Sequence, residues 1–139
     1  YPREEMLSKL KAEVSKWQIA DPTTPVIPAI DYIAVTAQAS AGKDGMYRLR
    51  MPDSQIDKAL SMAKEVHGVL ILDVQVGLST LQKELPFLEK YLKKPNVELA
   101  IDPEFSMTKS KRPPGTVIGT YGAEDINYAS SYLARFVRL

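Results

Sequence analysis

The sequence contains no cysteine and only one histidine among its 139 residues, and its charged groups nearly cancel at a formal net charge of +1. The absence of cysteine excludes disulfides, thiol catalysis and zinc–thiolate sites, although it identifies no compartment, because many exported proteins also lack cysteine. The single histidine, His67, lies at the wrong end of a predicted strand to complete a Ser-His-Asp set. A balanced charge provides no general attraction to nucleic acid or to anionic lipid.

Long apolar runs are also absent. No uninterrupted apolar stretch approaches the roughly 20 residues that span a bilayer, so no transmembrane segment is expected. The chain does not open on a secretory hydrophobic segment, so a signal segment is expected to be absent from this chain. The basic residues Lys109, Lys111 and Arg112 have no interleaved aromatic residues, which argues against a nucleic-acid partner. The Gly42-x-x-Gly45 spacing is too short for a phosphate-binding loop, and no cofactor is predicted.

The composition is globular, with 45% hydrophobic and 25% charged residues, and helical patterns alternate with extended ones. Residues 1–139 are predicted to form a single domain or the N-terminal half of a larger barrel domain, in which residues 1–30 are an N-terminal helix and a proline-rich connector. We expect helices at 2–17, 54–66, 79–94 and 126–137, and strands at 31–38, 69–75, 97–104 and 116–120. Residues 39–52 are expected to form a loop, and Pro86 should kink or divide the third helix. Trp17 is expected to anchor the first helix in the core.

Three of the predicted strands end in two polar residues that are spaced two apart. The pairs are Thr36 and Gln38, Asp73 and Gln75, and Asp102 and Glu104. Because side chains alternate between the faces of a strand, each pair lies on one face at the carboxyl end. Parallel α/β folds place ligand chemistry at that edge, so the pattern predicts a site there.

The order of elements, a helix followed by four β/α units, implies an α/β fold with a parallel sheet and right-handed crossovers. Such units form either half of a (β/α)8, TIM-like barrel or a small flavodoxin-like open sheet. Small residues below and polar residues above on one face, as in Ala34, Thr36 and Gln38, suit the mouth of a barrel, whereas an open sheet covered on both sides more often keeps both faces apolar. The preferred interpretation is a half-barrel fragment that contacts the remainder of its own chain or a partner polypeptide.

Three segments, GVLILDVQVG at 68–77, VELAIDPEF at 97–105 and PGTVIG at 114–119, resemble an uncharacterised family of bacterial exported or lipoprotein-type proteins. The similarity includes Thr36-Ala-Gln38 and Gly42-x-x-Gly45, and it covers residues 26–135. The resemblance implies an extracytoplasmic location, in the periplasm, at the cell surface or secreted. It also implies that the natural chain continues into further strand-and-helix units, while it assigns no activity.

The carboxylates Asp73, Asp102 and Glu104 are the candidate catalytic residues. Paired carboxylates act as general acid and as nucleophile or base on a glycosidic bond, and burial with mutual repulsion raises the pKa of one of them. Glu104 follows Pro103 and is the first choice as proton donor. The alternative is structural, because strand-end aspartates also cap helices or bind loop amides. Oxygen ligands would suit Mg²⁺ or Ca²⁺, but no metal site is assigned.

The candidate substrate-binding residues are Gln38, Gln75, Tyr47, Arg48 and Arg50. Amide groups donate to and accept from sugar hydroxyls, and tyrosine beside arginine is suited to stacking on a sugar or binding an anion. Amides satisfied by their own neighbours and a solvated loop are the structural alternatives. The sequence therefore predicts an exported glycosidase-like hydrolase or carbohydrate-binding protein. The competing prediction is a non-catalytic structural or accessory subunit of a cell-surface or membrane-associated assembly.

Overall fold

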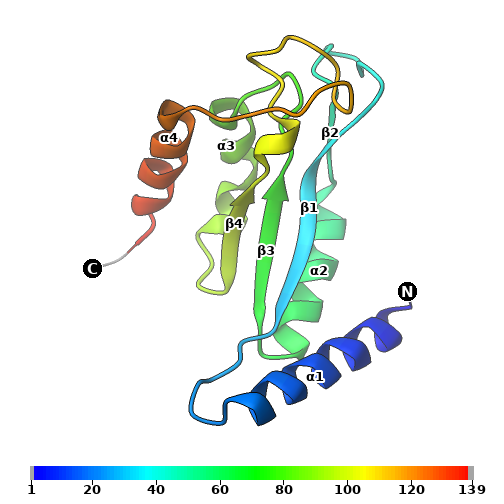
Figure 1. Cartoon of the computed structure of the whole chain (residues 1–139), viewed down its shortest axis with the longest axis vertical. Coiled ribbons are helices and arrows are strands. Elements are labelled where there is room, and N and C mark those ends of the chain that lie inside the picture. Colours follow the sequence, from blue (N-terminus) through cyan, green and yellow to red (C-terminus); the bar gives the residue numbers. More distant parts are fainter. Residues whose placement is uncertain (1, 138–139) are drawn as a thin grey trace.

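The computed structural model describes residues 2–137, which form an α/β fold around one open, mixed sheet of four strands in the order β2-β1-β3-β4 (Figure 1). β1, β3 and β4 are parallel, and β2 runs antiparallel to β1. The strands are β1 (Ala29–Ala37), β2 (Arg48–Arg50), β3 (Val69–Val74) and β4 (Val97–Ile101). The helices are α1 (Arg3–Ala20), α2 (Asp53–Glu65), α3 (Leu81–Leu92), α4 (Ala123–Ala134) and the 3-10 helix η1 (Pro103–Phe105).

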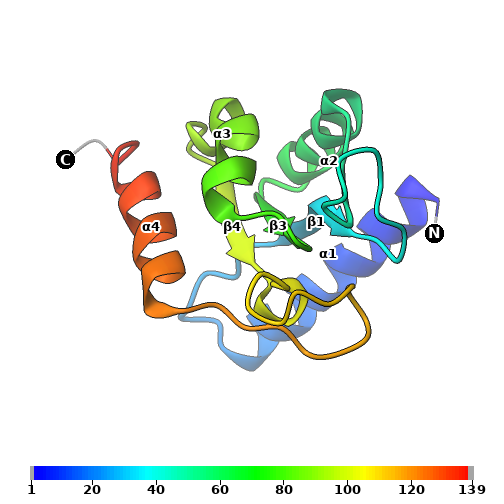
Figure 2. The same cartoon turned by 90° about the horizontal axis from the view of Figure 1, so that it is seen from above.

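Alternation along β3 separates a dry face of the sheet from an open one. Leu70, Leu72 and Val74 are fully buried, and they lie on the side where α2 and α3 pack (Figure 2). α2 contributes four buried residues to this core at helical spacing, and α3 contributes Leu81, Leu85 and Leu88. The intervening residues of β3 face the other way and are only partly buried, so the second face of the sheet lacks a comparable apolar cover.

α1 lies across the end of the sheet where β1 and β3 begin (Figure 1). Leu7 is its buried residue, and Met6 and Leu10 pack against the same core. The expectation that Trp17 anchors this helix is wrong, because its side chain is 66% exposed. No helix in the part of the chain described here is long and apolar enough to cross a membrane.

The predicted succession of four parallel strands is wrong at two places. The fourth strand is β2, which comes from the segment expected to be a loop, and it pairs antiparallel with the end of β1. Gly42 and Gly45 adopt the left-handed conformation there, with φ of 69° and 72°, which lets the chain turn back as a hairpin. Residues 116–120 form no strand, because the backbone N–H groups of Gly119 and Thr120 donate to the carbonyl groups of Glu104 and Ser106.

The open sheet fits the open-sheet alternative, and the preferred half-barrel is not established by residues 2–137. α3 runs unbroken through Pro86, so the expected division of that helix is also wrong. Pro86 is exposed in the second turn of the helix, where it removes one hydrogen bond, to the Gln82 carbonyl group, without ending the helix.

Candidate ligand site at the carboxyl ends of the strands

β1, β3 and β4 end at one edge of the sheet, where the hairpin at 38–47, η1 and the segment at 106–122 gather (Figure 1). Backbone hydrogen bonds fasten these segments to one another. The Gln38 amide donates to the Tyr47 carbonyl group at 2.9 Å, and the Leu78 amide donates to the Met46 carbonyl group at 2.9 Å. The predicted edge therefore exists, and its loops are held in place by the backbone.

Asp73 lies on the open face of β3, one residue before the strand ends. One of its carboxylate oxygens, Oδ1, is buried and has no hydrogen-bond partner. Burial raises the pKa of Asp73 to about 6, and the negative charges of Asp102 and Asp31 add to the shift. Asp73 therefore combines a buried oxygen that has no partner with surroundings that favour the protonated carboxyl group.

The side chains of Gln75 and Asp102 are hydrogen-bonded to each other and to backbone amides nearby. The Gln75 amide nitrogen donates to Asp102 Oδ2 at 3.3 Å, and Gln75 Oε1 accepts from the Ala37 backbone amide at 3.1 Å. The second oxygen of Asp102 accepts from the Glu104 backbone amide at 2.9 Å and caps η1. These contacts match the structural alternative for both residues, and any ligand would compete with them.

Glu104 lies on η1 and is exposed, and Gln38 is half-buried at the beginning of the hairpin. The structure thus brings together Asp73 and Asp102, and Asp102 accepts a hydrogen bond from Gln75. The Glu104 side chain is exposed to solvent. Within residues 2–137, no group of three or more histidine, aspartate or glutamate side chains is placed to hold a metal ion.

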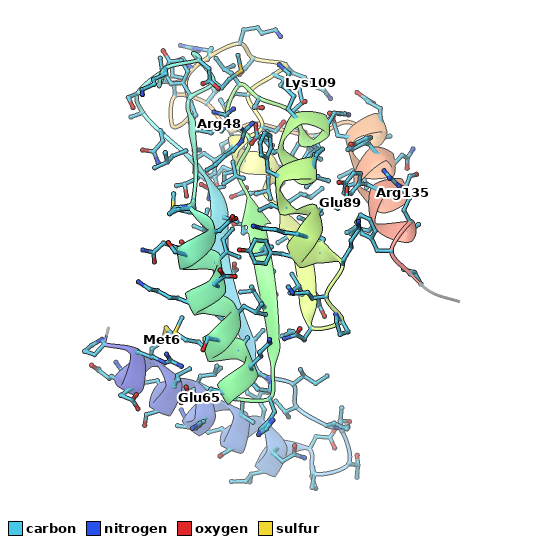
Figure 3. All side chains as sticks on the ribbon, turned by 180° about the vertical axis from the view of Figure 1, so that it is seen from behind. Met6, Arg48, Glu65, Glu89, Lys109 and Arg135 are labelled. Atoms are coloured by element: carbon cyan, nitrogen blue, oxygen red, sulfur yellow. The ribbon has the colours of Figure 1, made fainter. Side chains whose placement is uncertain are left out.

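Arg48 and Arg50 are bound by a carboxylate that the sequence interpretation missed. Glu84 of α3 is fully buried, and it accepts from Arg48 Nε at 2.9 Å and from Arg50 Nε at 2.7 Å. The Ser79 hydroxyl group also donates to it. Burial alone would raise the pKa of Glu84, but the hydrogen bonds from these three side chains outweigh burial and lower it. Figure 3 shows Arg48 near the N-terminal end of α3.

This Glu84 cluster, formed by Arg48, Arg50, Ser79 and Glu84, joins the hairpin to α3. Asp44 balances the second positive charge with a 2.9 Å contact to Arg48, and the Arg50 guanidinium group lies 3.5 Å above the ring centre of Phe87. Both arginines therefore have carboxylate partners within the protein. Tyr47, which has a φ of 52°, directly precedes Arg48 in the hairpin. A signal for Glu84 was present, because its position falls on the apolar stripe of its helix.

Tyr121 is the second residue that the sequence interpretation missed. Its hydroxyl group is buried and has no hydrogen-bond partner. Burial raises the pKa of Tyr121, and the charges of Asp125, Asp102 and Asp73 raise it further, so the phenol keeps its proton. No local pattern marks this tyrosine in the sequence, because the loop that carries it has no periodicity.

The candidate site thus holds two buried polar atoms without partners, Asp73 Oδ1 and the Tyr121 hydroxyl oxygen. Comparison of the chain with protein-family models, with curated proteins and with solved structures finds no match. The function of the site is therefore argued from its geometry and charge.

Replacing Glu84 with glutamine is expected to destabilise the fold by about 3 kcal/mol, because Arg48 and Arg50 lose the buried carboxylate that they share and only Arg48 keeps another one, Asp44. The matched control is Glu65→Gln, which removes the exposed ion pair with Arg3 and should cost less than about 1 kcal/mol. Urea unfolding of both variants measures the two free energies. Equal losses would show that the Glu84 cluster does not hold the hairpin.

Asp73→Asn is expected to raise the free energy of unfolding at pH 7. The raised pKa of Asp73, about 6 against an ordinary 3.8, means that the stability linked to its proton is complete below pH 3.8 and is lost as pH rises through 6. The amide does not titrate, so its advantage over wild type should disappear on acidification to about pH 3.5. Urea unfolding at the two pH values measures the difference, and a difference independent of pH would contradict the assignment.

Proposed function

We propose that the carboxyl edge of the sheet is a carbohydrate site, and that the protein is a glycosidase-like hydrolase or a sugar-binding relative of one. The observation that carries this proposal is the carboxyl group of Asp73, which has a buried oxygen without a partner and a pKa raised to about 6. Glycoside hydrolysis needs a carboxylic acid that is still protonated near neutral pH, with a second carboxylate close by. Export of the protein is supported by the family resemblance.

Asp73 is the better proton donor of the three predicted carboxylates. Its environment holds a proton, whereas Glu104 is exposed. Asp102 is the neighbouring carboxylate, and its negative charge helps to keep the proton on Asp73. Glu104 is then the group that would act from the solvent side of the site, as base or nucleophile. Gln38 and Gln75 would position sugar hydroxyl groups at the same edge.

Arg48 and Arg50, which were predicted to bind substrate, are instead hydrogen-bonded to Glu84. Their guanidinium groups are held by Glu84, so their role is to fix the hairpin that borders the site. Tyr47 directly precedes β2 and remains a candidate for stacking on a sugar ring.

We also propose that further polypeptide completes the sheet, as half of a TIM-like barrel requires. Three features support this. α2 and α3 pack on one face only, the other face exposes Ile33 to 40%, and β4 is an edge strand (Figure 2). A groove of about 700 Å³ runs beside β4, lined by Leu99 from β4 and by Leu133, Phe136 and Val137 from the region of α4.

The same groove favours the second candidate function, a non-catalytic subunit of a larger assembly. Edge strands present unpaired backbone groups, and a polypeptide strand is the ligand that satisfies them. The two candidate functions differ in the role of Asp73. A hydrolase requires a protonated carboxyl group at the carboxyl edge, whereas a non-catalytic subunit does not.

The hydrolase proposal predicts turnover of aryl glycosides that depends on the carboxylates. Asp73→Asn and Glu104→Gln are expected to abolish hydrolysis of a panel of nitrophenyl glycosides while the fold stays intact, because each removes a titratable group without changing its shape. Glu98→Gln, on the same face of the sheet but farther from the carboxyl edge, is the matched control and should keep full activity. Hydrolysis by wild type that both site variants retain would contradict the assignment.

The proposal for the sheet predicts that the 139-residue chain associates in solution, since its open face and free edge would otherwise stay exposed. Sedimentation velocity across a range of protein concentrations measures this, and a species larger than 15.5 kDa is expected. Leu133→Glu, which places a charge in the groove, should reduce the association. A monodisperse monomer of 15.5 kDa at all concentrations would count decisively against the proposal.

A further inference from the structure

Tyr121 reaches the site from the segment that leads into α4. Backbone contacts fix this segment: the Gly119 amide donates to the Glu104 carbonyl group at 2.6 Å, and the Thr120 amide donates to the Ser106 carbonyl group at 3.2 Å. Gly119 leaves no room for a side chain, because a Cβ atom there would meet the carbonyl oxygens of Ser106, Glu104 and Pro103. The position of Tyr121 is therefore set by the backbone on the residues immediately before it.

Packing against the core accounts for the aromatic ring of Tyr121 but not for its hydroxyl group. The ring packs against the core, as a phenylalanine ring would, but the hydroxyl oxygen is buried without a partner. A buried polar group without a hydrogen bond destabilises the folded protein, so the hydroxyl group lowers stability in the absence of a ligand. Tyr132 provides the contrast, because its buried hydroxyl group donates to Glu89 Oε2 at 2.6 Å.

The negative charges of Asp125, Asp102 and Asp73 act on the hydroxyl group, and both oxygens of Asp102 and one of Asp125 already accept hydrogen bonds. Asp125 accepts from the Gly122 amide, and Asp102 accepts from Gln75 and from the Glu104 amide. Asp73 Oδ1 is the buried oxygen in this group that has no partner. The two unpartnered atoms thus belong to neighbouring side chains of one site, and one of them is a permanent donor.

We propose that the Tyr121 hydroxyl group and the Asp73 carboxyl group together bind a hydroxyl group of an uncharged sugar. This inference rests on the carbohydrate function proposed above. A sugar hydroxyl both donates and accepts, so it has the chemistry to accept from Tyr121 and to donate to Asp73. Anionic sugars are rejected, because Asp31, Asp102 and Asp125 already concentrate negative charge around these two side chains.

The test compares Tyr121→Phe with Tyr132→Phe, which removes a hydroxyl group that has a protein partner. Methyl β-D-glucoside, methyl N-acetyl-β-D-glucosaminide and methyl β-D-glucuronide are titrated into labelled wild-type protein and both variants, and amide shifts in the nuclear magnetic resonance spectrum report the dissociation constants. Thermal unfolding is followed in parallel. Tyr121→Phe should weaken binding of a neutral sugar roughly three- to tenfold without lowering the melting temperature. Tyr132→Phe should lower the melting temperature without changing binding.

The outcomes separate this inference from the function on which it rests. If wild type binds none of the neutral glycosides, the carbohydrate function fails and the inference fails with it. If wild type binds a neutral glycoside but Tyr121→Phe binds it equally well, or loses stability as Tyr132→Phe does, the inference alone is overturned. Binding of the glucuronide as tight as that of the glucoside would overturn the assigned sugar class.

Discussion

The rest of the structure depends on the two-residue alternation of β3. Three successive inward positions are filled by Leu70, Leu72 and Val74, which are fully buried under α2 and α3. That burial fixes the register of the strand, because a shift by one residue would turn these side chains to the open face and bring Asp73 into the core. The position of Asp73 on the open face, at the carboxyl edge, therefore follows from packing on the opposite face of the same strand.

The buried carboxylate of Glu84 fixes the position of the hairpin, as apolar packing fixes the register of β3. Glu84 lies among the apolar residues of α3, where a leucine would pack well, yet it binds two arginines of β2 and the hydroxyl group of Ser79. Directional hydrogen bonds define the position of a three-residue strand more narrowly than an apolar contact does. The border of the site therefore depends on the ion pairs of Glu84 with Arg48 and Arg50 as well as on the backbone hydrogen bonds of the hairpin.

The sequence predicted the three central parallel strands, and with them the edge at which they end, because hydrophobic periodicity is a local property. It did not predict β2, because a short strand rich in charge has no apolar period and is recognisable only through its partners. Residues 116–120 look extended in sequence, but their amides find acceptors on η1 and not in the sheet. Asp73 was identified from its position at a strand end, whereas Tyr121 depends on tertiary contacts that bring a distant loop to that end.

The Glu84 cluster also has a consequence for how this fold changes over time. Arg48 and Arg50 share the buried carboxylate of Glu84, and Asp44 supplies the second negative charge through Arg48, so the loss of Glu84 leaves Arg50 without its carboxylate partner. Substitutions at Arg48, Arg50 and Glu84 are then tolerated only in combination, and the three positions should covary as one unit among descendants of the same ancestor. The spacing Arg-x-Arg, followed by Ser-x-x-x-x-Glu one helix later, is consequently a fingerprint by which distant relatives of this chain can be sought.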